Sequence, residues 1–144
     1  MLDPATGQAD AASGWTVGVS AQATTGTATA LPSEAPRQQT GANGSAVWTV
    51  LFGSTASRAT LTISEVQQTG YLFVGATCTV DGANRSVSFA QSGQNVSGTL
   101  TGIAASSTVA CTITNRPVAT LTLVKDVAFG AADASEWLLA ATGP

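Results

Sequence analysis

Histidine is absent from the 144 residues, and the chain has a single lysine, one tyrosine and only 9% charged residues. Without imidazole, the chain cannot build a Ser-His or Cys-His nucleophile, a histidine-ligated zinc site or a switch that titrates near neutral pH. Five basic residues against eight acidic ones give a net charge of −3, the wrong sign for a nucleic-acid-binding surface. The composition therefore argues against ordinary hydrolases and against nucleic acid as a partner.

Long hydrophobic runs are missing as well. The longest, residues 47–52 and 71–76, are much shorter than the roughly 20 apolar residues of a transmembrane helix. The two cysteines bring no third or fourth soft ligand for zinc. We therefore expect no membrane span, no metal and no cofactor.

What the chain does have is alternation of apolar residues with Thr or Ser, which is typical of strands with one wet face. No stretch shows a helical repeat. About eight strands separated by turns predict an all-β fold, an antiparallel Greek-key β-sandwich of immunoglobulin-like type. Residues 23–45 are predicted to form a surface loop with one short strand, and Trp15, Trp48 and Trp137 to fill the core. The predicted strands cover residues 15–19, 46–52, 59–63, 71–80, 86–89, 96–103, 108–114 and 119–124.

Cys78 and Cys111 each sit in an alternating, Thr-rich segment. A disulfide between adjacent strands is the interpretation that we favour, and two buried free thiols are the alternative. A bridge would close a loop of about 33 residues and indicate an oxidising, extracellular setting.

Residues 9–17 resemble residues 132–139, so that the chain reads as if it begins a second copy of itself near its end. In that alignment Asp3 falls opposite Asp126. The second copy contains the strand 119–125, and the equivalent strand of the first copy would lie before Met1. We expect residues 1–117 to form a sandwich repeat that lacks its opening strand. Residues 118–144 would then be the opening strands of a following repeat, or a terminal strand used in assembly.

Three segments resemble the prealbumin-like domains of bacterial surface proteins, often called SpaA-type or Cna B-type domains. Residues 61–71 are similar to a strand-Glu-loop-Gly-Tyr signature, and residues 109–117 to a closing strand that ends in Thr-Asn. Residues 121–127, together with 137–144, resemble the opening of a following repeat. The resemblance implies a prealbumin-like sandwich that serves as a stalk or spacer module of pilins and adhesins.

Some members of that family crosslink themselves by an isopeptide bond, and the matching motifs imply that Glu65 would be the acid, Asn115 the acyl donor and Lys125 the amine. The reaction needs a neutral amine in a dry pocket. Only ten residues separate Asn115 from Lys125, too few for a parallel crossover between neighbouring strands of one domain. We therefore do not expect this bond to form within one domain.

Three interpretations of Lys125 remain open. It belongs to the next repeat, or it enters a neighbouring chain by β-strand complementation, or it is an ordinary solvated lysine. The function that we expect is a non-catalytic structural repeat, extracellular or on the cell surface, contacting neighbouring repeats or copies of itself. The alternatives are a filament subunit that assembles head to tail by terminal strand exchange, and an adhesin-type module whose 23–45 loop binds a glycan or host protein. The cell wall is a further partner that we consider.

Overall fold

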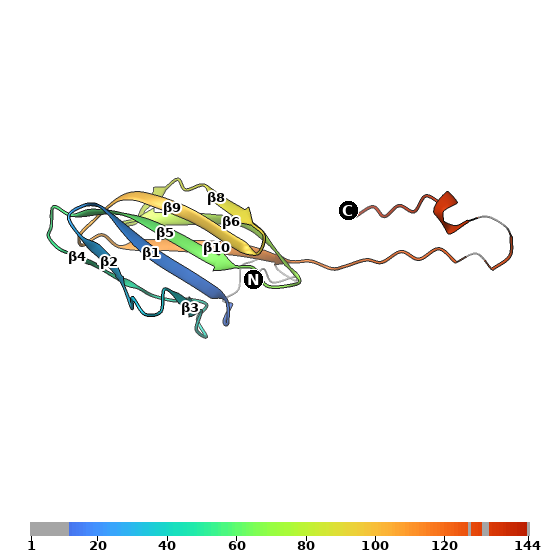
Figure 1. Ribbon diagram of the computed structural model, residues 1–144, viewed down its shortest axis with the longest axis horizontal. Helices are drawn as coiled ribbons and strands as arrows, with labels where there is room; N and C mark the ends of the chain where they lie inside the picture. Colours follow the sequence, from blue (N-terminus) through green and yellow to red (C-terminus); the bar gives the residue numbers. More distant parts are fainter. Residues whose placement is uncertain (1–11, 127, 131–132, 144) are drawn as a thin grey trace.

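The computed structural model describes residues 12–126, 128–130 and 133–143 (Figure 1). Strands dominate the described chain, and its one helical element is the short 3-10 turn η1 (Ala134–Glu136). The predicted all-β class is therefore confirmed. The strands are β1 (Thr16–Thr25), β2 (Ala28–Leu31), β3 (Arg37–Gln39), β4 (Thr49–Phe52), β5 (Arg58–Val66), β6 (Tyr71–Val80), β7 (Ala83–Arg85), β8 (Phe89–Ser92), β9 (Asn95–Ala104) and β10 (Val109–Pro117).

The strands form a β-sandwich in which every described pairing is antiparallel. One sheet has the order β3-β1-β5-β9-β8, the second β10-β6-β7, and β2 pairs with β4. The chain crosses between the two larger sheets after β5, after β7 and after β9, as in Greek-key sandwiches. Figure 1 shows the resulting elongated body, with the tail after β10 leading away from it.

Strand β5 shows why this sequence builds a sandwich. Ala59, Leu61, Ile63 and Glu65 are buried, while the residues between them are half-buried. This period of two sends one set of side chains into the core between the sheets. The core is completed by residues from β6 and β9 on either side, namely Cys78, Leu100 and Ile103.

Two irregularities in strand pairing change which alternate residues of a strand face the core. On β6 the register shifts opposite Thr114 and Asn115, so that Phe73 is half-buried before the shift and Cys78 is fully buried after it. A second shift occurs where β9 pairs with β5, near Gly102, whose φ of +69° suits a glycine. Both shifts let long strands keep apolar residues inward along their whole length.

Several predicted elements differ in the structure. Residues 46–48 and 86–88 lie outside strands, and the segment 23–45 contains the end of β1 together with β2 and β3 instead of one short strand. Trp15 is buried as expected, but Trp137 is 49% exposed and is not a core residue. Residues 119–124 alternate in sequence, but no described strand pairs with them, so they are not a strand here.

All described strands lie between Thr16 and Pro117, and residues 118–126 continue as extended chain (Figure 1). The internal echo cannot be compared in full, because residues 9–11, 131 and 132 lie outside the described residues, as do Asp3 and the rest of 1–8. The division into 1–117 and 118–144 stays a prediction. A search of the described residues finds no helix with the length and apolar character needed to span a membrane.

Candidate functional site

A buried polar cluster lies where β5 ends against β10. Glu65 occupies the last inward position of β5, and Gln67 follows two residues later on the same phase. Asn115 belongs to β10, in the opposite sheet. Glu65 and Asn115 are each 4% exposed, so this polar contact is enclosed by the sandwich.

One carboxylate oxygen ties the three side chains together. Gln67 Nε2 donates a hydrogen bond of 2.6 Å to Glu65 Oε1, and Asn115 Nδ2 donates one of 2.7 Å to the same atom. The second bond joins the two sheets across 50 residues of sequence. Burial raises the pKa of Glu65, although both hydrogen bonds act in the opposite direction. The carboxyl group is therefore held in a dry site that disfavours its charge.

The same cluster leaves hydrogen-bonding capacity unused. The other amide oxygens, Asn115 Oδ1 and Gln67 Oε1, are buried and have no hydrogen-bond partner among the described residues. The indole nitrogen of Trp48 is in the same condition. Such groups are costly in a folded protein, so each calls for an explanation.

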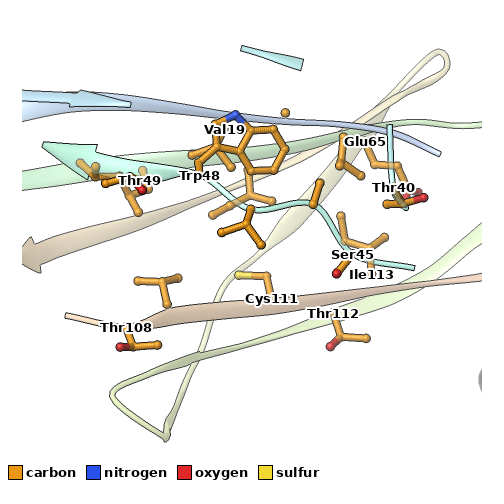
Figure 2. Close-up of a pocket in the computed structure, with 18 of the residues that line it drawn as sticks. Val19, Thr40, Ser45, Trp48, Thr49, Glu65, Thr108, Cys111, Thr112 and Ile113 are labelled. Atoms are coloured by element: carbon orange, nitrogen blue, oxygen red, sulfur yellow. The ribbon is translucent and has the colours of Figure 1, made fainter. Parts of the chain in front are cut away.

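An apolar hollow of about 700 Å³ adjoins the cluster. Its walls are inward residues of β1, β5 and β10 together with the segment 44–50, and Glu65 and Asn115 lie in its lining. Figure 2 shows Trp48 on one side of the hollow and Cys111 of β10 on the other, with Glu65 toward one end and Thr108 toward the opposite end. The hollow is thus an elongated, mainly apolar space with polar side chains at both ends, and its buried carboxyl group, that of Glu65, lies at one of them.

The structure brings two of the three isopeptide residues together. Glu65 and Asn115 are in direct contact, as the motif match implies. Lys125 is exposed on the tail, where its Nζ donates a 3.2 Å hydrogen bond to the Asp126 carbonyl and lies 4.7 Å from the centroid of the Trp137 ring. Lys125 is therefore not part of the cluster in its own chain, and the expectation that no isopeptide bond forms within one domain stays a prediction.

The two cysteines are joined. Cys78 on β6 pairs directly with Cys111 on β10, with a Cα–Cα distance of 4.1 Å, and the Sγ atoms form a disulfide. This confirms the predicted bridge between adjacent strands and excludes the free-thiol alternative. Cys111 also lines the hollow, so the bridge braces the wall on the β10 side.

Gln67 and the hollow escaped the sequence analysis. The signal for Gln67 was present, because it continues the odd-numbered inward phase of Leu61, Ile63 and Glu65. The hollow had no such signal, because it depends on which strands become neighbours in space.

Within the ranges that the structure describes, no group of three or more His, Cys, Asp or Glu side chains is placed to hold a metal ion. What the site can offer chemically is a protonatable carboxyl group, two amides and an apolar channel leading to them. Comparisons with protein-family models, with curated proteins and with solved structures find no match for this chain.

Proposed function

We propose that the chain is a non-catalytic structural module, a stalk or spacer, of an extracellular bacterial surface protein. The observation that carries this proposal is the Cys78–Cys111 disulfide, which links β10 to β6 within the core. Disulfides persist mainly in oxidising, extracellular compartments. The resemblance of residues 61–71 and 109–117 to prealbumin-like surface domains supports the same function.

The position of the bridge suits a module under tension. Strand β10 leads directly into the tail, so a force applied through the tail acts first on β10. The disulfide fixes β10 covalently to β6, and the Asn115–Glu65 hydrogen bond fixes it to the opposite sheet. Both attachments resist removal of β10 from the body.

Single-molecule stretching of the full chain from its two ends tests the proposal. We expect a discrete unfolding event, with the 33-residue loop between the cysteines withheld from extension. The reduced protein is the matched control, and its unfolding should release about 110 Å more chain, at roughly 3.3–3.6 Å per residue. Oxidised chain that extends without a resolved unfolding event would refute a mechanical role for the module.

A filament subunit is the second candidate, and one observation favours it. The tail carries apolar side chains in open solvent, including Leu121 at 67% exposed and Leu123 at 44%. Apolar residues in such an alternating segment are expected to be covered by a partner. Head-to-tail assembly through this segment would cover them.

A further inference from the structure

Strand β10 is an edge strand in the part of the chain that the structure describes. It is nine residues long, which is a long row of unpaired backbone groups for a sheet edge. The apolar hollow lies between this strand and the segment 44–50. An extended segment added to β10 would therefore find backbone partners on one side and an apolar space for its inward side chains.

The tail has the pattern that such a space requires. Residues 119–125 alternate, and their odd positions form one face that is apolar except at its end. The even positions are two threonines and a valine. All of these side chains are exposed in the structure. The face made of the odd positions consists of Ala119, Leu121, Leu123 and Lys125.

We propose that the edge of β10, which has no neighbour among the described strands, accepts residues 119–125 of a second copy of this chain as a parallel strand that fills the hollow and places Lys125 beside Glu65 and Asn115. This inference deepens the filament candidate by naming the slot, its occupant and the register. It does not depend on the stalk function.

The register follows from matching the two inward faces. The inward residues of β10 are also the odd ones, and their order along the strand is apolar, apolar, apolar and then amide. An offset of ten residues matches the two faces position by position. The facing pairs are Ala119 with Val109, Leu121 with Cys111, Leu123 with Ile113, and Lys125 with Asn115.

Charge selects the parallel direction. In the parallel register the only lysine of the chain reaches the buried carboxyl group of Glu65 and the unpartnered Oδ1 of Asn115. An ammonium group can donate to both oxygens. The antiparallel direction would place Lys125 near Val109, where the exposed Asp81 carboxylate accepts a hydrogen bond from the Thr108 amide. It would leave Ala119 facing the buried cluster, with no donor for Asn115 Oδ1.

The occupant must come from another copy. To lie parallel to β10, the strand has to begin beside Val109, about 26 Å from Pro117 at roughly 3.3 Å per residue. Only Val118 separates Pro117 from Ala119, and one residue cannot span that distance. A head-to-tail contact of this kind uses two different surfaces of each copy, so it generates open chains or rings.

Sedimentation velocity of the full chain, from about 1 µM to about 1 mM, tests the association. We expect oligomers that grow with concentration. Leu123→Asp should weaken the association at least tenfold, because a Leu loses its burial and a carboxylate enters an apolar space. Thr122→Asp is the matched control on the opposite face of the same segment and should associate nearly as the wild type does.

Both substitutions lie in the exposed tail, so at the lowest concentration, where all three proteins are expected to be monomeric, thermal unfolding should show the same midpoint. A wild-type chain that stays monomeric throughout refutes the proposal, as do equal effects of the two variants. If the wild type is monomeric and deletion of residues 1–11 creates the association, the slot belongs to that N-terminal segment and the proposal is wrong.

Cysteine pairing tests the register. Thr114→Cys protein is mixed with Val124→Cys protein under mild oxidation, since the parallel register makes these outward positions neighbours. We expect a covalent dimer from this mixture and none from Thr114→Cys with Thr120→Cys. The opposite result would show an antiparallel strand and overturn the placement of Lys125 at the polar cluster.

Discussion

Replacing Glu65 tests whether the buried cluster holds the two sheets together. In Glu65→Ala the amide groups of Gln67 and Asn115 lose their common acceptor inside the sandwich. Each buried donor left without a partner costs about 1–3 kcal/mol, so with two donors we expect the free energy of unfolding to fall by about 2–6 kcal/mol. That is a large share of the roughly 5–15 kcal/mol that stabilises a domain of ordinary size.

Glu65→Gln should behave differently, because the glutamine side chain keeps an oxygen that can accept both hydrogen bonds. Burial raises the pKa of Glu65. The folded state therefore favours the neutral carboxyl, which glutamine resembles in shape and charge. We expect this variant to be at least as stable as the wild type at neutral pH.

The pH dependence gives the matching test. The folded-state pKa of Glu65 is raised. The contribution of this carboxyl group to the free energy of unfolding is therefore fully present below its unfolded-state pKa, and it is lost as pH rises through its folded-state pKa. The wild type should therefore lose stability across that window, and Glu65→Gln should lack this loss. Glu34→Gln, at an exposed carboxyl, is the control and should keep the wild-type profile.

The free energy of unfolding of the wild type and the three variants is measured by denaturant unfolding at a series of pH values, with tryptophan fluorescence as the signal. Equal losses for Glu65→Ala and Glu65→Gln at neutral pH would refute the reasoning, since they would mean that the acceptor oxygen is irrelevant. A Glu65→Gln profile that still falls with the wild type would place the titrating group elsewhere.

Three further results are expected. Reducing the disulfide should cost about 4 kcal/mol of unfolding free energy by the loop-entropy model for a 33-residue separation, and an unchanged denaturation midpoint would contradict it. Leu100→Ala, at a side chain 1% exposed, should cost about 2–5 kcal/mol in the same assay, whereas Leu51→Ala at an exposed position should cost little. Attack of the Lys125 amine on the Asn115 carboxamide would release ammonia (~17 Da), and intact mass under reducing conditions should show that loss only in species that contain two or more chains.

Alternation was enough to predict the strands that pair along their whole length. Residues 59–63 and 71–80 were expected as strands, and β5 and β6 contain them, because both strands have hydrogen-bonded neighbours. The same alternation failed at residues 119–124, which have the pattern but no neighbouring strand in the part of the chain that the structure describes. A pattern reports which face is apolar, and pairing needs a second strand in reach.

The polar cluster was half predictable. Motif matching paired Glu65 with Asn115, and their side chains do meet in the structure. The ten-residue spacing argued against Lys125 joining them within one domain, and in the structure Lys125 lies on the exposed tail. Trp137 was assigned to a core because its segment alternates, but nothing in a linear pattern says whether a segment packs onto its own body, and Trp137 also lies on the exposed tail.

The cluster itself explains why an external cation is the expected completion of this sandwich. Burial raises the pKa of the Glu65 carboxyl in spite of its two amide donors, and the neighbouring amide oxygens lack donors among the described residues. An ammonium group would satisfy Asn115 Oδ1 and favour the ionised Glu65. Glu65→Gln should therefore leave the isolated chain stable while weakening self-association in sedimentation velocity. A variant that associates as the wild type does would mean that apolar burial of the tail alone drives assembly and that Lys125 contributes nothing to it.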